Sequence, residues 1–131
     1  FSKIHEVLKP GGRAAIQFIT IEDAVYDAYR RSADFIQTYI FPGGMLPTAK
    51  VFQNIAQAAG LDLLNSKAFG QHYAQTLAQW RERFNNAFEA GQLPSGFDER
   101  FKRIWNYYLA YCEGGFRAGG IDVMQVALTR K

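Results

Sequence analysis

A chain of 131 residues, 48% of them hydrophobic, is long enough for one domain-sized core and too short for two. A net charge of +3, with acidic and basic residues interspersed, argues against nucleic acid as a partner. The single cysteine, Cys112, excludes an intrachain disulfide and a cysteine-based zinc site. The aromatic content of 15% predicts either an aromatic-rich core or a pocket for a bulky apolar ligand.

The first predicted elements are a short helix and a strand. Apolar residues from Ile4 to Leu8 have helical spacing, and a proline and two glycines in Lys9–Gly12 end the helix. The apolar run at 13–19 predicts a strand that is buried on both faces. These elements indicate that the chain enters an α/β fold partway through. Any cofactor site built by earlier strand–helix units is therefore expected upstream of this sequence.

Residues 20–40 are predicted to form a helix with Thr20 as its N-cap. Its apolar stripe comprises Val25, Tyr29, Phe35, Ile36, Tyr39 and Ile40. The glycines and prolines of 41–47 predict a loop. A helix over 48–59 and a strand over 61–69 follow, and each ends at a glycine.

Two long amphipathic helices are predicted next. The first begins near Gly70 and reaches Phe88, and the second covers 101–116, with a glycine- and proline-containing loop at 91–96 between them. A strand over 121–129 closes the chain. This order of elements is typical of an α/β fold, and we interpret it as the latter half of a doubly wound sheet with extra helices inserted between strands.

The residues alone contain no familiar catalytic motif and no metal-binding pair, so candidate site residues rest on position. His72 and Tyr73 begin a helix directly after a predicted strand, and ligands of open α/β sheets bind beyond the carboxyl ends of strands. Gln17 is a polar side chain in an otherwise apolar strand. It is either a core amide satisfied by neighbouring backbone or a residue that faces a site.

Four segments are long and distinctive: YIFPGGMLP (Tyr39–Pro47), FGQHYAQTLAQWRERF (Phe69–Phe84), FKRIWNYYLAYCEGGFR (Phe101–Arg117) and GIDVMQV (Gly120–Val126). Together they resemble, in order and over essentially the whole chain, the C-terminal part of cyclopropane-fatty-acyl-phospholipid synthases. The resemblance implies a Rossmann-like methyltransferase fold that depends on S-adenosylmethionine. Residues 1–131 would then be a single partial domain, the C-terminal portion of the methyltransferase domain.

The resemblance also implies a chemistry. Enzymes of this family add the methyl carbon of S-adenosylmethionine to a cis double bond of an unsaturated phospholipid acyl chain. A carbocation-like intermediate then loses a proton and closes a cyclopropane ring, and bound bicarbonate is the family's proposed base. Tyr73 matches the tyrosine of that anion pocket, and the backbone around Ile19 matches a strand-end contact. These two residues and Gln17 are the catalytic candidates.

Gln17 departs from the family pattern, because the well-known synthases carry a histidine there. A glutamine still donates a hydrogen bond to an anion but carries no charge. We still expect anion binding, whereas the departure at Gln17 argues against ring closure more than against simple methyl transfer. The other pocket residues and the glycine-rich cofactor loop lie upstream in the family. No cofactor-binding residue is therefore expected in this chain, and we expect it to be inactive alone.

Residues 20–47 correspond to the family's lipid-binding insertion. An acyl tail requires a long apolar channel, and the aromatic stripe here fits that need. The residues expected to line it are Phe35, Tyr39, Phe41 and Met45. For each of them, simple packing against the sheet stays open.

The leading hypothesis is thus the C-terminal part of a cyclopropane-fatty-acyl-phospholipid synthase. A lipid C-methyltransferase that closes no ring is a second hypothesis, and a noncatalytic lipid-binding module is a third. We expect the full protein to be cytoplasmic, peripheral to the inner face of the membrane. The apolar strand at 13–19, lacking neighbouring strands, also predicts a homo-oligomer.

Overall fold

The computed structural model describes all of residues 1–131 as helices around a three-stranded sheet. In chain order the elements are α1 (Ser2–Val7), β1 (Arg13–Ile21), α2 (Asp23–Tyr29), η1 (Ile36–Ile40), α3 (Ala49–Ala58), β2 (Leu61–Ala68), α4 (Gly70–Glu89), α5 (Glu99–Ala118) and β3 (Ile121–Arg130). The mixture of helices and strands confirms the α/β class. All three predicted strands and both long helices are present.

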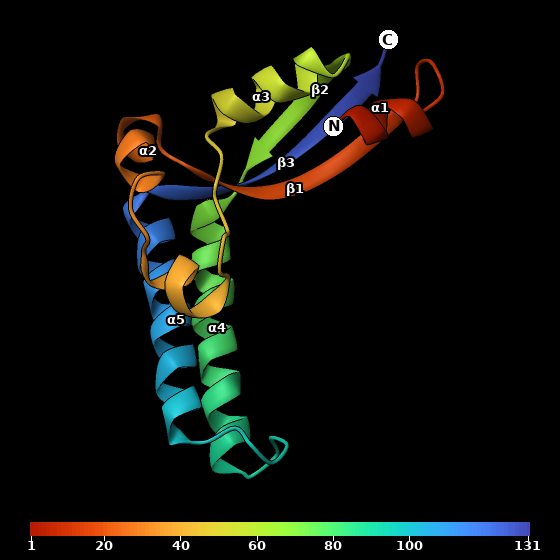
Figure 1. The fold of residues 1–131 in the computed structure, drawn as a ribbon. Coiled ribbons are helices and arrows are strands. Elements are labelled where there is room, and N and C mark those ends of the chain that lie inside the picture. Colours follow the sequence, from red (N-terminus) through yellow and green to blue (C-terminus); the bar gives the residue numbers. More distant parts are fainter.

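The sheet has the strand order β1-β3-β2, and the central β3 is antiparallel to both neighbours. β1 and β2 therefore run in the same direction, so their carboxyl ends lie at the same end of the sheet, where β3 begins. Figure 1 shows α4 and α5 extending away from this end. The arrangement places the first turn of α4 beside the strand ends that hold ligands in open α/β sheets.

One face of the sheet is covered by α1 and α3. The α3 sequence AKVFQNIAQA repeats apolar residues at helical spacing, and the Thr48 side chain caps its start by accepting from Val51 N–H at 3.2 Å. The ring of Phe52 stacks on that of Phe18, with centroids 3.8 Å apart. The buried residues of this cluster are Phe52, Ala56, Leu61, Val126 and Leu128. Each large apolar side chain buried here contributes roughly 1.5–3 kcal/mol.

The opposite face is bare over most of β1, so the prediction that this strand is buried on both faces was wrong. Arg13, Ala15 and Gln17 are exposed and alternate with more buried neighbours. Two features explain the exposure. No helix of this chain covers that face before Ile19, and β1 pairs with a strand on one side only. β1 is thus an edge strand, and the rest of this chain buries only part of its apolar surface.

The predicted helix over 20–40 is also corrected, because the structure divides it into α2 and a turn of π-helix, η1. Thr20 is not its N-cap but a buried residue of β1, and Glu22 precedes α2 without a capping side-chain bond. The backbone N–H of Asp34 donates to Gln37 Oε1, and Gln37 N–H donates to Asp34 Oδ1. This reciprocal pair favours a new helical start at Asp34, since such bonds compete with a continuous helix.

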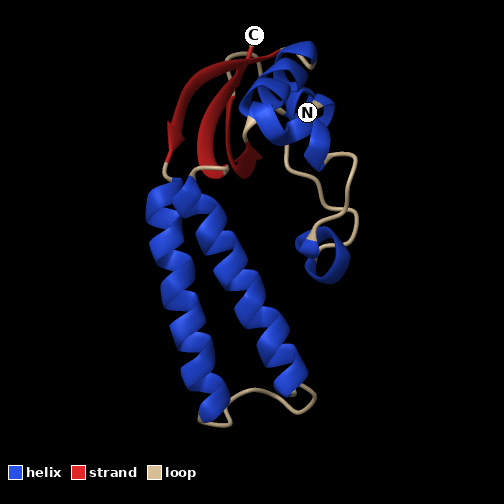
Figure 2. Ribbon diagram, turned by 90° about the vertical axis from the view of Figure 1, so that its left-hand side faces the viewer, coloured by secondary structure: helices blue, strands red, loops and turns tan.

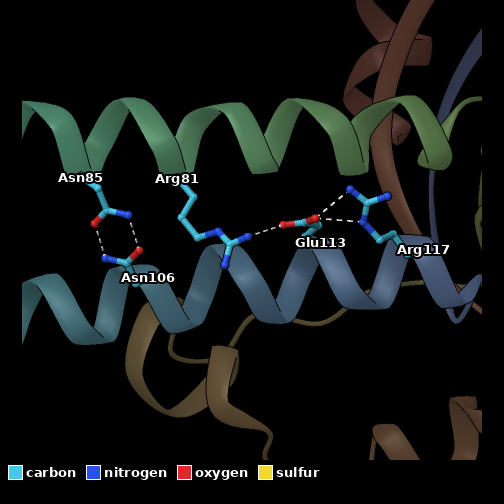
Figure 3. Close-up of polar contacts among 5 residues, drawn as sticks. All are labelled: Arg81, Asn85, Asn106, Glu113 and Arg117. Carbon is cyan, nitrogen blue, oxygen red and sulfur yellow. Dashed lines mark hydrogen bonds and ion pairs between the residues drawn. The ribbon is translucent and has the colours of Figure 1, made fainter.

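The helices α4 and α5 stand side by side and are joined at their far end by a loop (Figure 2). Three polar contacts cross or flank their interface (Figure 3). The Glu113 carboxylate is only 13% exposed and forms ion pairs with Arg81 at 3.0 Å and with Arg117 at 2.8 Å. The amides of Asn85 and Asn106 bond each other reciprocally at 2.8 Å. Because these groups pair only in one alignment, they fix how α4 lies along α5.

None of the helices combines the length and the apolar character that crossing a membrane requires.

Candidate functional site

The first residue of α4, Gly70, lies beside the start of β3, at the end of the sheet where β1 and β2 end. Gly70 N–H donates to Asp122 Oδ1 at 2.7 Å, and the same oxygen accepts from Val123 N–H at 2.8 Å. A Cβ at position 70 would lie 2.6 Å from that oxygen. Only glycine therefore allows α4 to begin this close to β3, and this contact sets the position of the next turn, which carries Tyr73.

Tyr73 and Ile19, two of the residues predicted from sequence, lie against the same apolar cluster. Its buried members are Ala74, Leu77, Leu109, Phe116 and Val123. The Tyr73 ring meets the rings of Trp80 and Phe116 edge to face, at 5.9 and 5.2 Å between centroids. Two elements whose residues are 54 positions apart in sequence thus pack on one cluster at the carboxyl end of β1. Their catalytic role stays a prediction.

Two further groups, Tyr108 and Cys112, join Tyr73 in this region. Burial is the main cause that raises the pKa of Tyr108 to about 12 and that of Cys112 to about 11. Burial and then the nearby Cys112 also raise the pKa of Tyr73. Both hydroxyls and the thiol are therefore neutral at physiological pH, and they present hydrogen-bond donors rather than charges. Sequence analysis placed Tyr108 and Cys112 only on an apolar helix face and missed this grouping.

Gln17 does not belong to that cluster. Its side chain is exposed on β1, and its Oε1 accepts a hydrogen bond from Gln125 Nε2 at 2.9 Å. Of the two alternatives left open by the sequence, the core amide is therefore wrong. Gln17 precedes Ile19 by two residues in the strand, so both side chains point to the same face of the sheet.

Of the four predicted acyl-binding residues, Phe35 precedes η1, Tyr39 lies in it, and Phe41 and Met45 follow it. None of the four lines either of the two hollows described below. Phe35 is half-buried, whereas Tyr39, Phe41 and Met45 are 62%, 55% and 53% exposed. Phe41 comes near the site, because its ring meets that of Tyr108 edge to face at 6.1 Å. Their role in binding an acyl chain stays a prediction.

Two hollows open beside the strand ends, with volumes of about 530 and 290 Å³. Asp122 and Gly119 line both of them, and His72 lines the smaller one. Neither is lined by Tyr73. We therefore place the candidate site at the grouping of Tyr73, Tyr108 and Cys112, which combines hydrogen-bond donors with an apolar wall, and not at these shallow polar hollows.

S-adenosylmethionine does not fit the strand-to-helix turns of this chain. A nucleotide-type cofactor at such a turn is held by free backbone N–H groups of a glycine-rich segment. The turn from β1 into α2 is formed by the acidic residues Glu22 and Asp23 and is not rich in glycine. In the turn from β2 into α4, the N–H of Gly70 is not free, because it already donates to Asp122. The chain also contains no group of three or more His, Cys, Asp or Glu side chains that could hold a metal ion.

Comparison with known proteins agrees with this geometry. The family model described as mycolic acid cyclopropane synthetase matches residues 1–126. Tuberculostearic acid methyltransferase UfaA1 of Mycobacterium tuberculosis (strain ATCC 25618 / H37Rv) is 43% identical over 132 residues, covering 100% of this chain and 31% of that protein. The cyclopropane-fatty-acyl-phospholipid synthase of Escherichia coli (strain K12) is 39% identical over 98 residues, covering 73% of this chain and 24% of the enzyme.

Solved structures show the same relationship. The cyclopropane synthase MmaA2 from Mycobacterium tuberculosis superposes with a TM-score of 0.83 at 29% identity, covering 98% of this chain and 48% of that one. The mycolic acid cyclopropane synthase CmaA1 complexed with SAH and CTAB gives a TM-score of 0.83 at 30% identity, with the same coverage. The chain spans about a third of the length of UfaA1 and about half of MmaA2. The chain belongs to the cyclopropane synthase family of S-adenosylmethionine-dependent methyltransferases.

Proposed function

We propose that this chain forms the acyl-binding side of an enzyme that adds a one-carbon unit to the double bond of a lipid acyl chain. S-adenosylmethionine, bound by residues outside this chain, would supply that carbon as an electrophilic methyl group. The chain's own residues would hold the acyl chain and help to place the base that removes a proton. The acceptor we propose is an unsaturated phospholipid acyl chain, reached by peripheral contact with the membrane.

The observation that carries this proposal is the meeting of Tyr73 and Ile19 on one apolar cluster at the carboxyl end of the sheet. The Tyr73 hydroxyl makes no hydrogen bond within the chain, and burial keeps it neutral. A free donor against an apolar wall suits an anionic base placed beside a hydrocarbon. Bicarbonate is the base we propose, and the Tyr73 hydroxyl would donate to it.

A second candidate reaction leaves a methyl branch and closes no ring. Gln17 favours it, because an exposed neutral amide bonded to Gln125 supplies no charge to orient a base toward the new methyl group. The relative that matches the whole chain at 43% identity is named a tuberculostearic acid methyltransferase, which agrees with this candidate. Both reactions pass through the carbocation that methyl addition produces. Loss of a proton from the new methyl group, with formation of a carbon–carbon bond, closes the ring, whereas loss of a proton from a neighbouring chain carbon forms a double bond and leaves a methyl-branched alkene.

The test is to express the full-length protein in cells that contain monounsaturated phospholipids and to analyse the fatty acids by mass spectrometry and NMR. A gain of one CH₂ supports one-carbon transfer. Cyclopropane ring protons in the NMR spectrum identify ring closure, whereas a methyl or methylene signal without them identifies the branch. Unchanged fatty acids, with the protein folded and S-adenosylmethionine bound, would refute the proposal. Supplying free fatty acid or phospholipid vesicles in vitro separates the two possible acceptors.

A further inference from the structure

The segment 22–47, which we call the cap segment, is a closed loop attached to the fold at its two ends. The N–H of Ile21 donates to Pro47 C=O at 3.1 Å, and Glu22 N–H donates to Gly120 C=O at 3.1 Å. These bonds hold the entry and exit of the cap segment together beside the start of β3. No residue of α2 or η1 is buried, so the cap segment contributes little to the core.

Internal hydrogen bonds give the cap segment a structure of its own. The Tyr29 hydroxyl accepts from Leu46 N–H at 3.1 Å and so ties the end of α2 to the far end of the segment. The Gln37 side chain donates to Gly44 C=O at 2.9 Å. Together with the reciprocal bonds of Asp34 and Gln37, these contacts allow the cap segment to move as a unit about its two ends.

One side-chain hydrogen bond joins the cap segment to the helix pair. The Tyr111 hydroxyl of α5 donates to Asp34 Oδ2 at 3.3 Å. The Phe35 ring meets the Tyr107 ring at 4.5 Å and the Tyr111 ring at 6.5 Å between centroids. Tyr107 and Tyr111 are one helical turn apart and stacked at 6.0 Å, so they form a single aromatic surface on the outer face of α5.

This surface lies on a different face of α5 from the candidate site. Tyr108 and Cys112 face α4 and the Tyr73 cluster, whereas Tyr107 and Tyr111 are 54% and 44% exposed. Six residues after Phe35, the Phe41 ring meets the Tyr108 ring edge to face at 6.1 Å between centroids. Figure 1 shows η1 in front of the helix pair, in agreement with these contacts.

We propose that Tyr107 and Tyr111 are positioning residues, which hold the cap segment against α5 and so place Phe41 over the Tyr73–Tyr108 site where the acyl chain binds. This inference rests on the proposed function for the identity of the ligand. Neither tyrosine contacts the reacting atoms. If the contacts of these tyrosines with the cap segment are weakened, the residues of the site are unchanged, but the cap segment covers the site in a smaller fraction of molecules. Acyl chains then bind more weakly, while the bound complex reacts at its usual rate.

Two variants of the full-length protein test the inference. Tyr111→Phe removes the hydroxyl bond and keeps the ring, and Tyr107→Ala removes the ring on which Phe35 packs. Asp34→Ala is unsuitable, because the same carboxylate also accepts a hydrogen bond from Gln37 N–H at the start of η1. Phe97→Ala is the matched control, since that ring is 42% exposed and packs on Phe101 at 4.6 Å, far along the chain from the cap segment.

Hydrogen–deuterium exchange of amides 23–46 provides a readout that does not depend on activity. We expect these amides to exchange about two- to tenfold faster in Tyr111→Phe, because the loss of one ordinary hydrogen bond changes an equilibrium constant by about this factor. The increase in exchange rate should be larger in Tyr107→Ala. KM for the acyl lipid should rise by a similar factor, with kcat within about twofold of the parent. Phe97→Ala should change neither quantity.

Exchange of amides 23–46 that is unchanged in Tyr107→Ala would overturn the inference, even if the enzyme is active. So would a fall in kcat at constant KM, which would place these tyrosines in the reaction itself. If the parent protein modifies no acyl lipid, the proposed function fails. The exchange measurement still decides whether the two tyrosines hold the cap segment.

Discussion

The ring of Tyr73 in the first turn of α4 meets the ring of Phe116 near the end of α5 edge to face, with centroids 5.2 Å apart. The contact joins the two ends of the helix pair that lie beside the sheet. It also fixes the direction of the Tyr73 ring by packing alone, because the hydroxyl makes no hydrogen bond within the chain. Packing and chemistry at this residue can therefore be separated by one substitution.

Tyr73→Phe in the full-length enzyme should lower turnover about ten- to a hundredfold. A hydroxyl that bonds a charged partner in the transition state contributes roughly 1.5–3 kcal/mol, which corresponds to that factor. The ring contacts with Trp80 and Phe116 remain, so the melting temperature should stay close to that of the parent. Steady-state kinetics and a thermal melt are sufficient to check this. Turnover within about twofold of the parent would leave Tyr73 a structural residue only.

Alkaline pH should destabilise the fold through Tyr108. Burial raises its pKa to about 12 in the folded state from the ordinary value of 10.0, so the unfolded chain loses this proton first. The stabilisation from the neutral hydroxyl is fully present below pH 10 and is lost as the pH rises from 10 to 12. Urea unfolding at pH 8 and at pH 11 measures the loss.

In Tyr108→Phe the difference in unfolding free energy between pH 8 and pH 11 should be smaller than in the parent. Tyr39→Phe, which removes a hydroxyl from a ring that is 62% exposed, is the control. An identical pH dependence in the parent and Tyr108→Phe would contradict the assignment.

Glu113→Gln should destabilise the protein by about 1 kcal/mol, because it removes the charge that two arginines share. The carboxylate is only 13% exposed, but Arg81 and Arg117 are 40% and 54% exposed, so solvent screens much of the interaction. Chemical unfolding measures the effect. Glu6→Gln, in the exposed pair of Glu6 with Lys3, should change stability by only a few tenths of a kcal/mol. Equal effects of the two substitutions would show that burial of Glu113 adds nothing.

Gly70→Ala and Gly114→Ala should have opposite effects on stability. A methyl group at position 70 would lie 2.6 Å from Asp122 Oδ1 and 3.1 Å from the Phe116 ring, so we expect a loss of about 1–3 kcal/mol. Position 114 lies inside α5, and apart from the adjacent backbone of that helix no atom lies within 4 Å of a carbon added there. Alanine there should stabilise the helix by about 0.5–1 kcal/mol. Denaturant midpoints compare the two, and a stabilising Gly70→Ala would contradict the close approach of α4 to β3.

Elements whose signals are local could be predicted from the amino-acid sequence. The helical spacing of apolar residues and the flanking turn residues predicted α4 and α5, and the short apolar runs predicted β1, β2 and β3. The long distinctive segments indicated the family, and its motif named Tyr73 and Ile19. Both residues do lie on one cluster.

Features that depend on residues distant in sequence became visible only in the folded chain. The exposure of Gln17 arises because no helix of this chain covers that face of β1 before Ile19, and the apolar residues of the strand do not reveal this in the sequence. The break in the helix predicted for 20–40 follows from the mutual bonds of Asp34 and Gln37 and from the contact of Phe35 with Tyr107 across 72 residues. Helical spacing describes one segment at a time. The pairing of segments is decided by which surfaces meet when the chain folds, because burial and hydrogen bonding are properties of the pair.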